Sequence, residues 1–276
     1  MQLCYNGSFL AADKPVFTAD NRSFRYGDGC FETMRVYQGQ IMLADLHFER
    51  LFTSLRILHF NVPTHFTKTY LTKFILELCH LNNVSNLARV RVTVFRGGGG
   101  LYAPEDNTPH FLIQCWELQR QVFELNIQGL TLDIYADARK SADKIGNVKS
   151  NNCLPYILAS QYAKQHQFNE VVLLNQYGRV ADTTIANIFV VKQQTIYTPP
   201  LSEGCVCGVM RKHLLKGESP FKIKEQPLSI DDLENADEIF LSNAIFGIRW
   251  VGAFRDSSYG NATAAILHDL VHEGML

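Results

Sequence analysis

Apolar and polar residues follow two different periods along this chain. Strict alternation over 88–96 predicts a strand and places Arg89, Arg91 and Thr93 on one of its faces. Residues 110–116 are predicted to form a further strand. Apolar residues that recur every three or four positions predict helices near 45–60, 68–80 and 154–167. The pattern therefore indicates a chain built from both strands and helices.

The same two periods continue in the second half of the chain. They predict strands over 130–135, 171–174 and 180–191, and helices from Val209 and near 261–273. Polar residues 118–122 separate the halves and are typical of a linker. We therefore predict a first domain over residues 1–117 and a second over residues 123–276.

Composition limits the class of protein. The chain has 276 residues, of which 46% are hydrophobic and 19% charged, so it can bury one or two substantial cores. A net charge of −1 gives no electrostatic reason to expect a nucleic acid or a membrane as partner. The absence of a bilayer-length apolar run or a signal-peptide pattern predicts a cytoplasmic location. The scattered cysteines predict neither a disulfide framework nor a metal site.

Lys149 is the first candidate for chemistry. It lies in a polar loop, 146–152, directly before the predicted helix 154–167. Most lysines are exposed, so a solvated loop lysine is the plainest interpretation. A lysine that loses its proton can instead form a Schiff base with a carbonyl group. Asp182 and Asn187 follow it on the predicted strand 180–191.

Three motifs together carry a resemblance to a known family. They are YGDGCFET at 26–33, KSNN at 149–152 and GRVADTTIANIF at 178–189. The chain resembles the class IV aminotransferases, pyridoxal 5'-phosphate enzymes of fold type IV that include branched-chain and D-amino acid aminotransferases and aminodeoxychorismate lyases. The resemblance covers nearly the whole chain. It implies a two-domain α/β fold, with a smaller N-terminal α/β sandwich and a larger C-terminal barrel-like domain.

The resemblance also implies a cofactor site. Lys149 would hold pyridoxal 5'-phosphate as a Schiff base and then move the substrate proton. Arg50, in the segment HFERL, would reach the cofactor phosphate, which suits the guanidinium fork. Asp182 stands where the family usually has Glu, beside the ring nitrogen. Further cofactor contacts are implied at Asn187, Val209, Met210, Ser242, Asn243 and Ala244.

Two residues are candidates for binding the substrate. By resemblance, Phe31 would face the substrate pocket, although its residue type is equally typical of a core. Arg91 aligns with an arginine in the corresponding strand of the branched-chain enzymes and would bind a carboxylate. The alternative for Arg91 is an ordinary place on a solvent-facing side of the strand.

Two reactions compete within the family. An aminotransferase would exchange amino groups between an amino acid, with branched-chain amino acids as one option, and a 2-oxo acid. The lyase would release pyruvate and 4-aminobenzoate from 4-amino-4-deoxychorismate. Leu154 stands where branched-chain enzymes usually have Tyr, and Leu101-Tyr102-Ala103 replaces the Arg-x-His of D-amino acid enzymes. The glycine run after Arg96 is lyase-like.

We place the aminotransferase ahead of the lyase because of the breadth of that activity in the family. A second alternative is a non-catalytic ligand-binding protein on the same fold, and the presence of Lys149 argues against it. A plain interaction module would leave the spacing of Arg50, Lys149 and Asp182 unexplained. Family members are usually homodimers, so a homodimer is expected.

Overall fold

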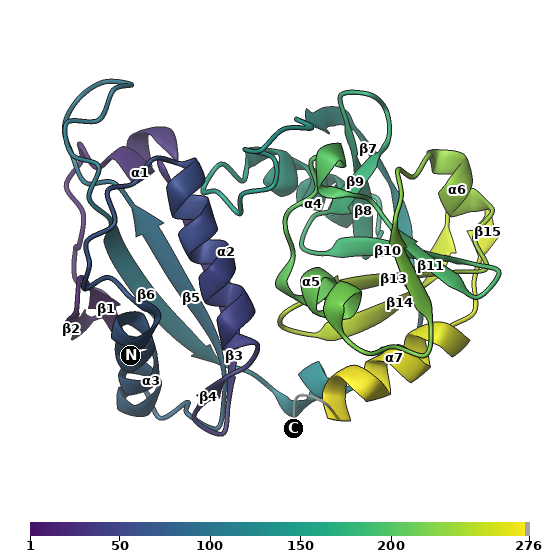
Figure 1. Cartoon of the computed structure of the whole chain (residues 1–276), viewed down its shortest axis with the longest axis horizontal. Helices are drawn as coiled ribbons and strands as arrows, with labels where there is room; N and C mark the ends of the chain where they lie inside the picture. The colour runs from purple at the N-terminus through teal and green to yellow at the C-terminus, as the bar shows by residue number, and fades with distance from the viewer. Residues whose placement is uncertain (274–276) are drawn as a thin grey trace. The chain divides into compact units, whose positions relative to one another are not determined.

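The computed structural model describes residues 1–273, and contacts within the chain divide it into two units, whose elements are labelled in Figure 1. Unit 1 comprises Met1–Val122 and Lys149–Asn152, and unit 2 comprises Phe123–Val148 and Cys153–Leu276. The predicted second domain ran without a break from 123 to 276, whereas Lys149–Asn152 packs with unit 1. The predicted domain limits, 1–117 and 123–276, stay a prediction for the two folding units. The segment Lys149–Asn152 departs from them, because it packs with unit 1.

A six-stranded sheet forms the centre of unit 1, with strand order β2-β1-β6-β5-β3-β4. The strands are β1 (Gln2–Tyr5), β2 (Ser8–Ala11), β3 (Gly29–Tyr37), β4 (Gln40–Ile41), β5 (Leu87–Phe95) and β6 (His110–Glu117). The helices are α1 (Arg22–Tyr26), α2 (Ala44–Ile57) and α3 (Lys68–Leu81). Helices α2 and α3 pack on the sheet, as Figure 1 shows, and both match helices predicted from the sequence.

Alternation along β5 divides its side chains between two environments. Val92 is fully buried, whereas Arg89 is exposed and Arg91 is half-buried. Arg91 Nε donates to Thr93 Oγ1 at 3.1 Å, which confirms the predicted shared face. Thr93 is the register partner of Phe31 on β3, so Phe31 belongs to the same face of the sheet.

A nine-stranded sheet forms the centre of unit 2, in the order β12-β11-β10-β13-β14-β7-β8-β9, with β15 beside β14. The first strands are β7 (Leu130–Lys140), β8 (Glu170–Asn175), β9 (Val180–Thr183), β10 (Asn187–Lys192) and β11 (Thr195–Thr198). The others are β12 (Lys222–Glu225), β13 (Glu238–Asn243), β14 (Gly247–Phe254) and β15 (Ser257–Ser258). The helices are α4 (Leu154–Gln165), α5 (Val209–Lys216), α6 (Ile230–Glu234) and α7 (Ala262–Glu273).

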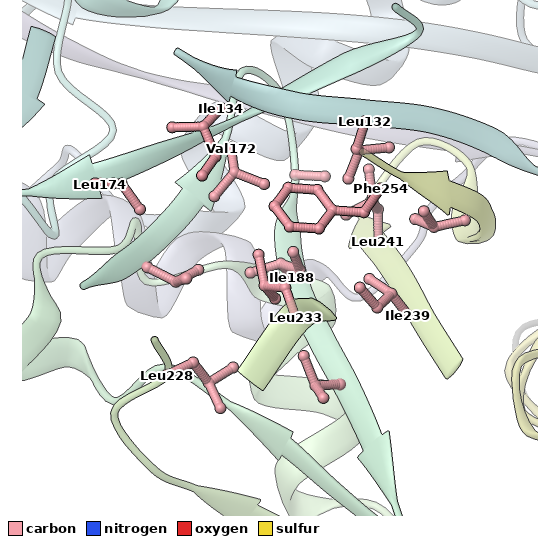
Figure 2. Packing of buried hydrophobic residues seen from close by; sticks show 14 residues of the cluster. Leu132, Ile134, Val172, Leu174, Ile188, Leu228, Leu233, Ile239, Leu241 and Phe254 are labelled. Atoms are coloured by element: carbon pink, nitrogen blue, oxygen red, sulfur yellow. The ribbon is translucent and has the colours of Figure 1, made fainter. Parts of the chain in front are cut away.

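The sheet of unit 2 curls, because β9 at one end of the strand order contacts β10, the third strand from the other end. Figure 2 shows the apolar cluster that packs inside, with Val172, Ile188, Leu241 and Phe254 among its members. Each of these side chains is essentially inaccessible to water, and burying one contributes about 1.5–3 kcal/mol. The expected two-part α/β fold with a barrel-like second unit is confirmed.

The strand predicted over 180–191 is wrong as a single element. It breaks at residues 184–186, because β9 pairs with β8 while β10 pairs with β11 and β13. The Thr183 amide donates to the Ala186 carbonyl at 2.9 Å and closes the turn. Thr184 Oγ1 donates to Glu170, which fixes the turn against β8. Within the described residues, no helix has the length and apolar character needed to cross a membrane.

Candidate active site

Lys149 lies in a short segment that pairs with the start of β3. The Phe31 amide donates to the Lys149 carbonyl at 2.9 Å, and the Asn151 amide donates to the Gly29 carbonyl at 3.0 Å. An isolated antiparallel bridge lies between these two hydrogen bonds. The Lys149 side chain is half-buried, and its backbone is fixed by pairing with β3. Lys149 is therefore not a freely solvated loop lysine.

Three of the predicted residues meet at one aromatic ring. Lys149 Nζ lies 4.6 Å from the centroid of the Phe31 ring, and Arg91 Cζ lies 3.6 Å from it. Cations are attracted to the negative face of such a ring, so both contacts are favourable. Phe31 itself is 8% exposed. Unit 1 therefore brings a primary amine and a guanidinium to the same apolar surface.

Arg50 belongs to a buried charged cluster around Glu32. Glu32 follows Phe31 on β3, so its side chain points to the opposite face of the sheet. Arg50 Nε and Nη2 donate to Glu32 Oε1 and Oε2 at 2.7 and 2.6 Å. His47, from the same helix α2, contacts Glu32 Oε2 at 2.6 Å through Nδ1. Burial alone would raise the pKa of Glu32, but the charge of Arg50 and these hydrogen bonds lower it to about 2. Burial lowers the pKa of His47, so its ring is neutral at pH 7 and donates through Nδ1.

Asp182, on β9, is the buried carboxylate of unit 2. Its Oδ2 accepts from Lys140 Nζ at 2.7 Å, from the Val206 amide at 3.0 Å and from Tyr156 Oη at 3.3 Å. Its Oδ1 is also buried and has no hydrogen-bond partner among residues 1–273. A buried carboxylate oxygen without a donor is unfavourable, so Oδ1 is a ready acceptor for a ligand N–H group.

The loop before α5 is anchored to both ends of the broken strand. The Val206 amide donates to Asp182 Oδ2 at 3.0 Å, and Asn187 Nδ2 donates to the Val206 carbonyl at 2.9 Å. Asn147 adds a third support, because its Nδ2 donates to the carbonyls of Leu201 and Cys205. The candidate residues Asp182 and Asn187 therefore hold the loop that leads into α5.

Helix α5 begins at Val209 as predicted. Its N-cap is Gly208, which supplies no side-chain cap, and the first amides of a helix have no partner within the helix. Such an end favours an anion such as phosphate. The Met210 side chain is fully buried, so only its backbone amide can contribute to such a site.

Three cofactor contacts were predicted at the end of β13, at Ser242, Asn243 and Ala244, and their side chains lie in different environments. Ser242 is the register partner of Asn187, and its Oγ is buried without a hydrogen-bond partner. Asn243 Oδ1 accepts from the amides of two residues of the β13–β14 turn, so this side chain is occupied by the turn. Ala244 lies in that turn and is half-buried. Ser242 is thus the member of this group whose side chain is suited to a ligand, and the roles of the other two stay predictions.

Gly208 has no room for a side chain. A Cβ atom there would lie 1.8 Å from Asn187 Oδ1, although its φ of −64° suits any residue. We expect Gly208→Ala to displace Asn187 or the start of α5 and to cost about 1–3 kcal/mol of unfolding free energy. Thermal and denaturant unfolding measure the loss. The control is Gly260→Ala, because a Cβ there meets nothing within 4 Å, and equal stability of the two variants would contradict this packing.

Four functional candidates escaped the sequence analysis. Glu32 and His47 were inside recognised motifs, but no local pattern shows that they share one hydrogen-bonded cluster with Arg50. Lys140 and Tyr156 meet Asp182 only through the fold, at separations of 42 and 26 residues. A buried lysine needs a partner, yet burial of Lys140 is visible only once β7 is placed.

Comparison with known proteins now identifies the class. The family model for class IV amino-transferases matches residues 29–254. A putative branched-chain-amino-acid aminotransferase of Methanocaldococcus jannaschii is 30% identical over 247 residues, covering 88% of this chain and 84% of that protein. An aminodeoxychorismate lyase of Vibrio harveyi is 28% identical over 233 residues, covering 83% of each.

A solved structure shows the same fold. A hypothetical aminotransferase from Mycobacterium tuberculosis, in a form with bound pyridoxal phosphate, superposes with a TM-score of 0.85 at 17% identity, covering 100% of this chain and 99% of that one. The protein belongs to the class IV aminotransferase family, whose members are pyridoxal-phosphate enzymes. Its relatives include both aminotransferases and lyases, so the family alone does not select the reaction.

Proposed function

We propose that this protein is an aminotransferase that uses pyridoxal 5'-phosphate and moves an amino group between an amino acid and a 2-oxo acid at Lys149. The observation that supports it most is the meeting of Lys149 and Arg91 at the Phe31 ring. An amine beside a carboxylate-binding guanidinium suits substrates that carry both an amino group and a carboxylate. The apolar ring suits an apolar side chain, so branched-chain amino acids are candidate substrates.

The residues present fit the proposed cofactor. Asp182 Oδ1 is a buried acceptor without a donor, which suits a protonated ring nitrogen. Ser242 Oγ is a buried hydroxyl without a partner, which suits a phosphate oxygen. The uncapped start of α5 adds backbone amides of Val209 and Met210 for the same phosphate. These complementary groups would be costly if they served only the fold.

When bound, pyridoxal phosphate supplies an aldehyde that condenses with amines and a ring that accepts electrons. Lys149 would present the primary amine for that aldehyde and would take and return the substrate's proton. Asp182 would accept a hydrogen bond from the ring nitrogen and favour its protonated form. Arg91 would bind the substrate carboxylate, and Phe31 would exclude water from the place of proton transfer.

The lyase remains the second candidate. One support is the similarity to the Vibrio harveyi aminodeoxychorismate lyase over 83% of both chains. The other is that Leu154 stands where branched-chain enzymes usually have a tyrosine. The same amine and carboxylate-binding group would serve an elimination that releases pyruvate and 4-aminobenzoate. A binding protein without turnover is the remaining alternative, and it would hold the cofactor but convert no substrate.

The visible absorption spectrum of the purified protein tests the proposal. We expect a cofactor band that is lost on adding an amino acid, and that returns when a 2-oxo acid follows. Pyruvate release from 4-amino-4-deoxychorismate without that reversible conversion would replace the aminotransferase by the lyase. A cofactor band that no amine changes would leave the binding protein, and no band after loading with pyridoxal phosphate would reject all three.

Arg50→Ala is expected to weaken pyridoxal phosphate binding roughly 10- to 100-fold, the worth of one or two hydrogen bonds to a charged group. Because Arg50 also compensates the buried Glu32, Arg50→Lys is tested beside it and keeps that charge. Equilibrium dialysis or fluorescence titration measures the affinity. Arg56→Ala, on the exposed side of the same helix, is the control. Unchanged affinity in folded Arg50→Ala would remove this residue from the phosphate site.

We also propose that the protein is a homodimer. Leu154, Ile157 and Leu158 recur at helical spacing on α4 and are 64%, 50% and 41% exposed. An exposed apolar row of this kind on a helix is typical of a contact surface. Sedimentation of the protein and of Leu158→Asp tests the assignment, and a monomeric wild-type protein at micromolar concentration would contradict it.

A further inference from the structure

The hydrogen bonds of Asp182 are distributed unequally between its two oxygens. Oδ2 accepts from Lys140, Tyr156 and the Val206 amide, whereas Oδ1 accepts from no donor. Both side chains of the Lys140–Asp182 pair are more than nine-tenths buried, with relative exposures of 6% and 2%. The Lys140 ammonium alone would compensate the charge of Asp182. The two further donors on Oδ2, with none on Oδ1, therefore need another explanation.

The donors come from separate elements. Lys140 ends β7, Tyr156 lies in the first turn of α4, and Val206 lies in the loop before α5. Lys140 Nζ also lies 5.1 Å from the Tyr156 ring centroid, so the two donors pack on each other. Burial and the charge of Asp182 raise the pKa of Tyr156 well above its usual value, so its hydroxyl stays protonated and donates. The carboxylate is therefore fixed from three directions.

We propose that Lys140 and Tyr156 are positioning residues that occupy Asp182 Oδ2, direct Oδ1 to the ring nitrogen of pyridoxal phosphate, and set how tightly that nitrogen holds its proton. The inference rests on the proposed function, since it needs the cofactor to bind at Asp182. Lys140 pairs with the buried Asp182 carboxylate through a hydrogen bond of 2.7 Å before the cofactor arrives. Afterwards its ammonium competes with the ring nitrogen for the same negative charge.

The sign of this competition follows from Coulomb's law. A cation beside the carboxylate reduces its attraction for a second cation and repels that cation directly. Removing the Lys140 charge should therefore make the ring nitrogen hold its proton more tightly. Removing the Tyr156 hydroxyl should act in the same direction but more weakly, because a neutral hydrogen bond is lost. If Lys140 and Tyr156 only held Asp182 in place, their removal would weaken its hydrogen bond to the ring nitrogen. The proton affinity of that nitrogen would then fall instead of rising.

Other titratable groups around this pair do not supply the same effect. Glu170, from β8, accepts hydrogen bonds from the Thr184 amide and hydroxyl, and burial raises its pKa. Burial raises the pKa of the Cys205 thiol to about 12, so this group is neutral at pH 7. The Cys153 thiol precedes α4 and contributes to the raised pKa of Tyr156. Lys140 is therefore the cation whose removal changes the charge at Asp182.

The test is the nitrogen-15 chemical shift of ring-labelled pyridoxal phosphate bound to the protein, followed against pH. Lys140→Met should raise the proton affinity of the ring nitrogen about tenfold, and Lys140→Arg should restore the wild-type value. Tyr156→Phe should produce a smaller shift of the same sign. Lys192→Met is the control, because Lys192 pairs with Asp232 elsewhere in unit 2, where both side chains are about one-third exposed, and it should change nothing.

The outcomes separate this inference from the proposed function. An unchanged or lowered proton affinity in a folded Lys140→Met protein would overturn the positioning role while the cofactor site stands. If Lys140→Met fails to fold, Tyr156→Phe decides, and a wild-type titration in that variant overturns the role of the tyrosine. A wild-type protein that binds no pyridoxal phosphate would overturn both this inference and the proposed function.

Discussion

Turnover is expected to fall about a thousandfold or more in Lys149→Ala, with both units still folded, because the variant loses the amine proposed to attach the cofactor and move the proton. The fold should tolerate the change, since the segment is held by the hydrogen bonds of its backbone to β3 and not by the side chain. Single-turnover absorption with an amino acid measures the chemical step, and circular dichroism checks the fold.

Lys144→Ala provides the matched control for Lys149. It removes an exposed lysine five residues before Lys149 in the connection that follows β7, and it should leave the rate unchanged. Cofactor bound by Lys149→Ala should also be removed by dialysis, because no covalent bond holds it. Retained turnover in Lys149→Ala would reject the catalytic role of this lysine, and equal losses in both variants would point to a general effect of the loop.

Glu32→Gln is expected to cost about 3–5 kcal/mol of unfolding free energy in unit 1, because it leaves the Arg50 guanidinium buried opposite a neutral amide. Glu32 is 1% exposed, so water cannot replace the lost charge. Denaturant unfolding measures the difference. The control is Asp45→Asn, whose partner is Lys68 and whose side chain is 90% exposed, and it should cost at most about 1 kcal/mol. Similar losses in the two variants would contradict the assigned importance of the buried cluster.

The same cluster gives an expected response to acid. The pKa of Glu32 is lowered from 4.5 to about 2, so its contribution to stability is fully present above pH 4.5 and is lost as the pH falls towards 2. The wild-type protein should therefore lose more stability over this window than Glu32→Gln does. Parallel acid titrations of the two proteins would instead show that Glu32 is not held ionised by Arg50 and His47.

Local patterns were sufficient for most of the fold. The helical period found α2, α3 and α4, and alternation placed Arg91 and Thr93 on one face of β5. The break between β9 and β10 was missed because the β-branched residues Thr183, Thr184 and Ile185, which favour strands, run through it. The change of neighbouring strand depends on pairing elsewhere in the sheet. Periodicity reports burial, and it does not report which partner causes the burial.

In the candidate site, too, the sequence indicated some residues and missed others. Motifs pointed to Lys149, Asp182 and Asn187, because a resemblance transfers a residue type at a known position. They did not show that Glu32 pairs with Arg50 or that Lys140 pairs with Asp182, since these contacts join residues far apart in the chain. Partner residues of this kind need the fold before they can be recognised.

A nascent chain of which only Met1–Val122 has emerged from the ribosome contains Phe31 and Arg91 but lacks Lys149, the third residue at that ring. The bridge between residues 30 and 150 forms only after the chain has extended well into the second half, and such long-range pairing is slow because the intervening loop must close first. The Lys149 amine therefore reaches the Phe31 ring only after the first 122 residues have been made. Cofactor attachment at Lys149, as proposed, would report that the first unit has received its last segment.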